Sequence, residues 1–174
     1  MNGTPRSFGD GHCTDTLNTL LRSELSAVEA YEKAMVRLED QQVLADLQSI
    51  RDEHARAGER LRERVTDRGA EPSNRTGPWS TVAAAVAGTS GMISPTTALW
   101  ALCQGEQHAI NEYEDALKHD GLDADGKQAI RRELLPLLRK HVDELNRLMG
   151  GSDASGARRS PDTLDDDQTG QMPL

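Results

Sequence analysis

Two carboxylates and two imidazoles occupy positions where a helical sequence needs apolar side chains. Glu24 and Glu106 each interrupt an apolar stripe with steps of three and four residues, and His54 and His141 interrupt two further stripes. Such steps place a stripe on one face of a helix, so all four side chains should point into a core. A charged group is rarely buried without a partner. The pattern therefore predicts a central cluster, made either of buried Glu–His pairs or of ligands for one zinc, iron or manganese ion.

The stripes around these residues predict four helices. The first should begin at a cap on Thr14 or Asp15, and the third should open at Ser94-Pro95. Gly69 should end the second helix and Gly150 the fourth. The expected ranges are about 14–39, 43–68, 94–119 and 130–149.

The third predicted helix repeats the first, and the fourth repeats the second. The key repeated residues are Glu24, Tyr31 and His54, which recur as Glu106, Tyr113 and His141. The chain is therefore expected to form two helical hairpins related by a pseudo-twofold axis. Counting about 1.5 Å per residue from the turn of each hairpin brings the acid and the imidazole of that hairpin to similar heights. Each acid should thus lie near the imidazole of its own hairpin.

The two ends and one long connection differ in composition from the helices. Residues 1–13 are expected to form a disordered arm and residues 150–174 a disordered acidic tail, around a bundle formed by residues 14–149. Residues 69–97 should form a crossover along the bundle, with one short Ala-rich helix anchored by Trp79. A partly ordered loop is the alternative. A crossover would make the third helix parallel to the second.

Composition limits the expected partners and compartment. The chain has 174 residues and a net charge of -9, so nucleic acid and anionic membranes are not expected as its main partners. No apolar stretch approaches the roughly 20 residues needed to span a bilayer, and the first ten residues do not resemble a signal peptide. Cys13 and Cys103 are expected to remain thiols, which fits the cytoplasm. The sequence leaves a homo-oligomer open and indicates no protein partner.

Two segments carry a resemblance to known proteins. They are Gly77-Pro-Trp-Ser-Thr-Val with the Ala-rich run to Gly88, and Gly105-Glu-Gln-His-Ala-Ile-Asn-Glu-Tyr-Glu-Asp-Ala-Leu117. With the repeated acids, tyrosines and histidines, they resemble the ferritin-like superfamily and, within it, an uncharacterised bacterial family described as a domain of unknown function. The resemblance covers about residues 14–149. It implies an all-α fold, a ferritin-like antiparallel four-helix bundle with a long crossover between helices two and three.

The resemblance also implies a set of metal ligands. Ferritin-like di-iron proteins use a Glu from each of two helices and a Glu-x-x-His from each of the other two. The residues that match these ligands are Glu24, His54, Glu106 and His141. Arg51 and Leu138 occupy the positions of the two remaining Glu residues. Without these carboxylates, charge counting argues against two metal ions and leaves room for one ion with two Glu and two His ligands.

Three further residues are expected to surround the cluster. Arg51 should lie close to it, where the guanidinium would repel a metal ion and pair with Glu24. Tyr31 and Tyr113 should steady the acids, although residues on apolar stripes are more often ordinary core residues. The Arg51 and Leu138 substitutions favour a cluster without metal.

Other candidates near the cluster carry less weight. Glu53 should point about 100° away from His54. Pro136 should kink the fourth helix, or split it in two, just before His141. Glu144 should join the cluster only if that kink rotates the last turns. The acidic joint at residues 120–126 lacks the spacing of a calcium loop.

Two functional classes remain. The favoured one is a non-catalytic, stress-related or structural bundle protein with a degenerate metal site. The alternative is a protein that binds iron, manganese or zinc and acts in iron handling or oxidant defence. The sequence contains no nucleophile motif, phosphate-binding loop or Cys-x-x-Cys motif, so it does not favour an enzyme.

Overall fold

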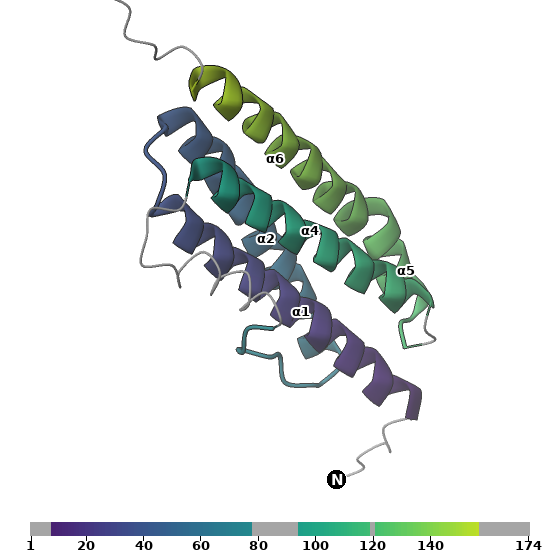
Figure 1. Ribbon diagram of the computed structural model, residues 1–174. Coiled ribbons are helices and arrows are strands. Elements are labelled where there is room, and N and C mark those ends of the chain that lie inside the picture. The colour runs from purple at the N-terminus through teal and green to yellow at the C-terminus, as the bar shows by residue number, and fades with distance from the viewer. Residues whose placement is uncertain (1–7, 78–93, 119–120, 157–174) are drawn as a thin grey trace, which may run out of the picture.

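The computed structural model describes the backbone of residues 8–77, 94–118 and 121–156. It is an all-α bundle of four long helices, called rods below: α1 (Phe8–Met35), α2 (Gln41–Asp67), α4 (Pro95–Lys118) and α6 (Leu135–Gly156). A short helix α5 (Ala124–Ala129) and a π-helical turn η1 (Ile130–Leu134) precede α6. Figure 1 shows α2 and α4 running in one direction and α1 and α6 in the other. The predicted antiparallel four-helix bundle, with its parallel second and third rods, is confirmed.

Local signals explain where the rods begin and end. The Asp40 carboxylate caps α2 by accepting hydrogen bonds from the backbone N–H groups of Gln42 and Val43, at 2.9 and 3.1 Å. Gly69 follows α2 with a φ of 66°, a left-handed conformation that glycine adopts without strain. Ser94 accepts a hydrogen bond from the Thr97 N–H at the start of α4. The predicted boundaries near Gly69 and Ser94 are therefore confirmed.

Two helix ends lie outside the predicted bounds. α1 begins at Phe8, before the predicted cap at Thr14 or Asp15, and Cys13 is buried in the core. The burial of Cys13 stabilises helical backbone in a segment whose composition favours disorder. α6 continues past Gly150 to residue 156, because glycine disfavours helical backbone by only about 1 kcal/mol and does not forbid it.

The predicted break in the last helix occurs earlier than expected. The Leu135 N–H donates to the Ile130 carbonyl, five residues back, which is the hydrogen bond of a π turn. Pro136 is the second residue of α6, directly after this turn. The interruption that Pro136 predicted is therefore present, as a π turn directly before that residue and not between Pro136 and His141. His141 lies in continuous α-helix.

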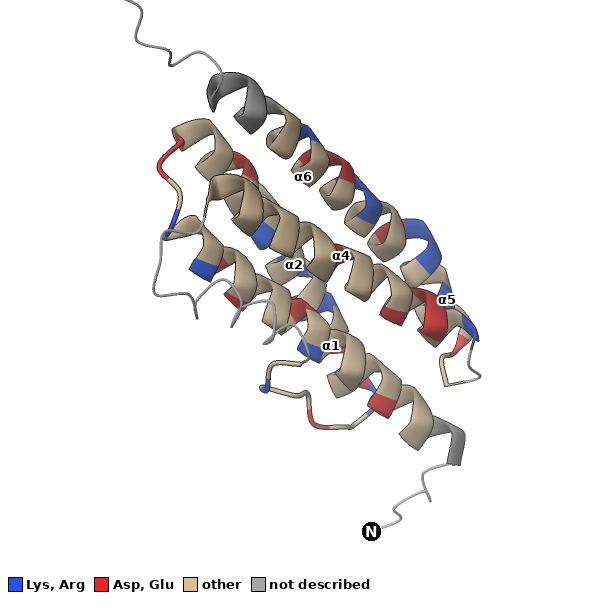
Figure 2. Cartoon of the chain, in the orientation of Figure 1, with Lys and Arg blue, Asp and Glu red and all other residues tan. Residues whose placement is uncertain are grey.

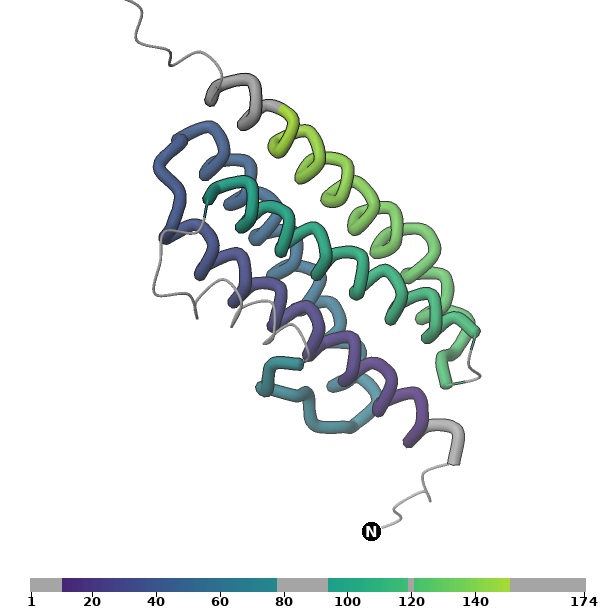
Figure 3. The backbone as a smooth tube through the Cα atoms, in the orientation of Figure 1, coloured from purple at the N-terminus to yellow at the C-terminus, as the bar shows by residue number. Residues whose placement is uncertain are grey.

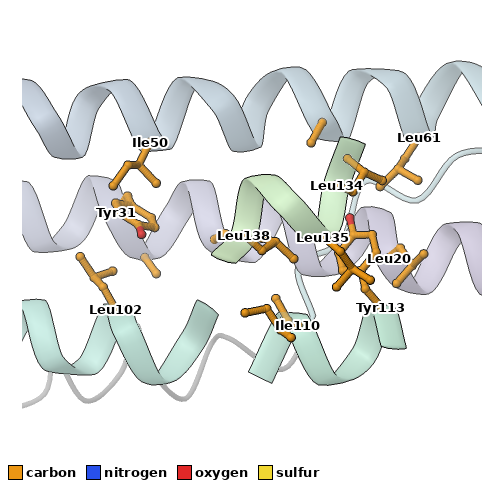
Figure 4. Close-up of a cluster of buried hydrophobic side chains, with 14 of the residues drawn as sticks. Leu20, Tyr31, Ile50, Leu61, Leu102, Ile110, Tyr113, Leu134, Leu135 and Leu138 are labelled. Atoms are coloured by element: carbon orange, nitrogen blue, oxygen red, sulfur yellow. The ribbon is translucent and has the colours of Figure 1, made fainter. Parts of the chain in front are cut away.

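The core fills the space between the four rods. Figure 4 shows Leu20, Ile50, Leu102 and Leu138, from α1, α2, α4 and α6, directed into the space between the helices at different levels along the bundle. Charged residues of both signs are spread along the rods (Figure 2). The core is thus apolar along most of its length, and the polar cluster interrupts it near the middle of the bundle.

The start of the connection after α2 lies along α1. The Gly77 N–H donates to the Arg22 carbonyl at 3.1 Å, and the Ser73 N–H donates to Asn18 Oδ1 at 2.7 Å. Figure 3 shows this segment as a teal tube beside α1. The predicted short helix and its anchor Trp79, most of the predicted arm and the predicted tail beyond residue 156 lie outside the described residues. No helix within the described ranges is long and apolar enough to cross a membrane.

Candidate metal centre

The four polar residues of the apolar stripes converge at the middle of the bundle. Glu24 is 2% exposed, Glu106 is 0% exposed, and His54 and His141 are each 1% exposed. Each of the four rods contributes one residue, and the two imidazole ring centroids lie 4.8 Å apart. The helical period of the sequence directs these four side chains inward, and the packing of the four helices brings them to the same level along the bundle axis.

His54 lies between the two acids. Its Nδ1 is 2.7 Å from Glu24 Oε2, and its Nε2 is 2.8 Å from Glu106 Oε1. Glu24 is therefore beside the imidazole of its own hairpin, as the counting predicted. Glu106 lies beside both imidazoles, since its Oε1 is at hydrogen-bond distance from His54 on the other hairpin and its Oε2 stands 3.5 Å from His141 Nδ1 on its own. The acid of the second hairpin thus also pairs with the first hairpin.

The two tyrosines also pair between the hairpins. The Tyr31 hydroxyl, from α1, donates to Glu106 Oε1 on α4 at 2.6 Å. The Tyr113 hydroxyl, from α4, donates to Glu24 Oε1 on α1. Both tyrosines are fully buried. Each hairpin therefore satisfies the acid of the other.

Arg51 does not join the cluster, and its predicted pairing with Glu24 is wrong. Its guanidinium pairs with Glu32 and, at 2.9 Å, with Asp52. These exposed carboxylates let the guanidinium remain hydrated, which a buried site would not. Leu138 is 2% exposed and packs in the apolar core. Neither position offers a carboxylate to the centre.

Glu53 contacts the cluster, contrary to its expected role. It faces away from His54, but Glu53 Oε2 accepts a hydrogen bond from His141 Nε2 at 2.7 Å, across the seam between α2 and α6. Lys140 Nζ lies 3.2 Å from the other carboxylate oxygen. The sequence contained an indication of this contact, because Glu53 and Lys140 occupy matching positions, each directly before one of the two histidines. Glu144 stays outside the cluster and pairs with Arg147.

Two buried acceptor atoms face each other without a donor between them. Glu106 Oε2 and His141 Nδ1 are the atoms that lack a hydrogen-bond partner among the buried side-chain polar atoms of the described residues. When His141 carries one ring proton and donates it from Nε2 to Glu53, the Nδ1 lone pair faces the carboxylate oxygen. In this tautomer the arrangement is repulsive unless a metal ion lies between the two atoms or a second proton on His141 turns the contact into an ion pair.

The donor set fits one metal ion. Within the described part of the chain, His54, Glu106 and His141 each offer a ligand atom, and these atoms lie within 4.8 Å of one another. Two imidazoles and one carboxylate suit zinc, iron or manganese. The second nitrogen of each imidazole faces a carboxylate, Glu24 or Glu53, which is the usual support of a metal-binding histidine. Two ions do not fit, because positions 51 and 138 supply no bridging carboxylate.

The charges of the cluster are strongly coupled. Burial alone would lower the pKa of His54, but the charges of Glu106 and Glu24 outweigh it and raise that pKa to about 10. Burial opposes ionisation of Glu106, yet the charge and hydrogen bond of His54, together with the nearby His141 imidazole, lower its pKa to about 2. Without metal, these directions favour an imidazolium at His54 beside an ionised Glu106.

Comparisons with known proteins agree with this fold. The sequence matches the family described as Domain of unknown function (DUF2383) over residues 12–119. No curated protein matches it. It is similar to a crystal structure of ferritin like, diiron-carboxylate proteins from Bacillus anthracis str. Ames, with 17% identity and a TM-score of 0.66, over 83% of this chain and 99% of that one. The predicted ferritin-like fold is confirmed, and the chain belongs to the DUF2383 family.

Proposed function

We propose that the protein binds one divalent transition-metal ion at the middle of the bundle. His54 Nε2, His141 Nδ1 and the Glu106 carboxylate would hold the ion. The observation that carries this proposal is the pair of facing acceptors, Glu106 Oε2 and His141 Nδ1, in a fully buried site. Glu24 then becomes a residue that orients His54, instead of the ligand that its family position implies.

The identity of the ion decides the role. Iron or manganese would supply redox chemistry for iron handling or oxidant defence, and zinc would supply a structural cross-link. The fold of the diiron-carboxylate proteins supports a metal-related role, and the Arg51 and Leu138 positions support a mononuclear site.

A metal-free structural or stress-related protein is the second candidate. The observation that favours it is the complete pairing of His54, whose two nitrogens both face carboxylates at hydrogen-bond distance. In that case the cluster is a buried ion pair, which specifies how the rods fit together more than it adds stability.

Metal analysis distinguishes the two candidates. We expect protein purified without a metal-binding tag, from cells grown with iron, manganese and zinc, to hold about one equivalent of a single metal. His141→Ala and Glu106→Gln should each lose most of it, because each removes a ligand. Glu114→Gln is the matched control on α4, since Glu114 is exposed and pairs with Arg139, and it should retain the metal.

Either of two results would contradict the proposal. One is metal far below one equivalent in the parent protein, with no uptake when metal is added back. The other is equal metal content in the parent, His141→Ala and Glu106→Gln proteins, which would place the metal elsewhere.

A further inference from the structure

A surface cleft between α2 and α6 leads to the candidate metal centre. The cleft has a volume of about 230 Å³, and Asp46, Glu53, Lys140 and Glu144 lie in its wall. His141 also lines it, although this residue is only 1% exposed. The cleft therefore ends on an imidazole that the proposed function makes a metal ligand.

Glu53 connects the cleft with the buried cluster. Its side chain is 18% exposed, its Oε1 lies 3.2 Å from Lys140 Nζ, and its Oε2 accepts from His141 Nε2. Asp46 and Glu144 pair instead with the exposed Arg147, away from the imidazole. Glu53 is thus the carboxylate of this wall that contacts both solvent and His141, the proposed metal ligand.

A second groove, between α1 and α2, reaches the other side of the cluster. It has a volume of about 470 Å³ and contacts Glu24 and His54. Arg56 and Arg60 lie in its wall with Glu59, so a cation that approaches there meets two positive side chains. At the α2/α6 cleft three carboxylates face the Lys140 ammonium and the Arg147 guanidinium, so the net charge there is still negative and favours a cation.

The internal repeat makes the α2/α6 seam asymmetric. Glu53 and Lys140 occupy equivalent positions in the two halves, each directly before a repeated histidine. The pseudo-twofold arrangement therefore sets an acid against a base across the seam. The Lys140 side chain is 67% exposed, so it can leave Glu53 for water at little cost.

We propose, on the basis of the proposed metal function, that Glu53 is a positioning residue that admits a divalent cation through the α2/α6 cleft. The approaching cation displaces Lys140 from the carboxylate, because a double charge competes well against an exposed ammonium. Glu53 also holds His141 through Nε2, which keeps the Nδ1 lone pair directed at Glu106 Oε2. One side chain thus serves both the approach of the ion and the orientation of its ligand.

Cobalt(II) loading of the chelator-treated full-length protein tests this inference. Stopped-flow absorbance gives the loading rate, and titration calorimetry gives the affinity. Glu53→Gln keeps an oxygen that can accept from His141 but removes the charge, so we expect loading about 10-fold slower or more. Its affinity should fall about 10-fold, as for other residues that support a metal-binding histidine.

Two further variants make the result specific. Lys140→Gln removes the competing ammonium from an exposed position, so loading should be about 3-fold faster with an affinity within about 2-fold of the parent. Glu59→Gln makes the same charge change as Glu53→Gln, but in the wall of the α1/α2 groove, and should load at the parent rate. If Glu53→Gln does not fold, the loading rates of Lys140→Gln and Glu59→Gln are compared with that of the parent protein and test the proposal instead.

The outcomes separate this inference from the function on which it rests. If cobalt binds but Glu53→Gln and Lys140→Gln both load at the parent rate, the role of Glu53 is overturned and the metal site stands. If Glu59→Gln slows loading as much as Glu53→Gln, the α2/α6 route is overturned. If the parent protein binds no cobalt, the proposed function itself fails.

Discussion

At the scale of single residues, the centre of the molecule depends on hydrogen bonds to two buried carboxylates. Glu106 accepts from Tyr31 and from His54 through one oxygen, and Glu24 accepts from Tyr113 and faces His54 through its two oxygens. A buried carboxylate without such donors would retain most of its desolvation cost. The tyrosines of the apolar stripes are therefore structural donors as well as core residues.

The tyrosine hydroxyls provide a stability test. Tyr31→Phe and Tyr113→Phe each remove one hydrogen bond to a buried charged group, so each should lower the free energy of unfolding by about 1.5–3 kcal/mol. Urea unfolding of chelator-treated protein, followed by circular dichroism, measures the loss. Because the two hydroxyls serve equivalent acids, similar losses are expected. A loss in only one variant would show that the two halves of the cluster are not equivalent.

At the scale of elements, α1 begins earlier than its sequence predicts because the α4–α5 connection packs against its first turns. A Cβ atom at Gly121 would lie 2.8 Å from Thr16 Oγ1 and 2.9 Å from His12 Cδ2. Thr16 Oγ1 is itself hydrogen-bonded to the His12 carbonyl at 3.0 Å. The connection therefore fits against α1 without space for a methyl group.

Substitution of two glycines tests this contact. Gly121→Ala should lower the melting temperature, with a loss of about 1–3 kcal/mol, because the first turns of α1 must shift. Gly150→Ala is the matched control inside α6, where a Cβ meets nothing within 4 Å, and it should raise stability by up to about 1 kcal/mol. Equal melting temperatures for the parent and Gly121→Ala would show that the contact between the connection and α1 is not rigid.

At the scale of the whole molecule, the two hairpins depend on each other. The hydrogen bonds from Tyr31, Tyr113 and His54 Nε2 cross between them, so neither hairpin alone can supply all the donors of its buried acid. α1 and α2 are joined by a short connection, and α4 and α6 by a segment that contains α5 and η1. The apolar core and the polar cluster join the two hairpins to each other. Their separation would expose the buried acids and imidazoles at once.

This dependence predicts cooperative opening. In chelator-treated protein, amide hydrogen exchange should give the same opening free energy for the central turns of α1, α2, α4 and α6. The first turns of α1 and the last turns of α6 should exchange faster and serve as internal references. Earlier exchange of one complete hairpin would mean that the hairpins are separable units.

The sequence by itself determined the helical class, the four rods and the inward direction of the two acids and two imidazoles. These features follow from the 3.6-residue period and the internal repeat, which are properties of the chain along one dimension. The helix boundaries at Gly69 and Ser94 have the same local origin.

Only the tertiary structure decided which groups meet. The contacts between residues of different helices depend on how the helices are rotated and shifted against one another. Examples are the contact of Glu106 with His54, the contact of Glu53 with His141, and the pairing of Arg51 with Glu32 outside the cluster. A shift of one residue moves a side chain about 100° around its helix, and no local pattern fixes that register between segments distant in sequence. The packing of the rods therefore placed the two unsatisfied acceptors face to face at the centre of the bundle.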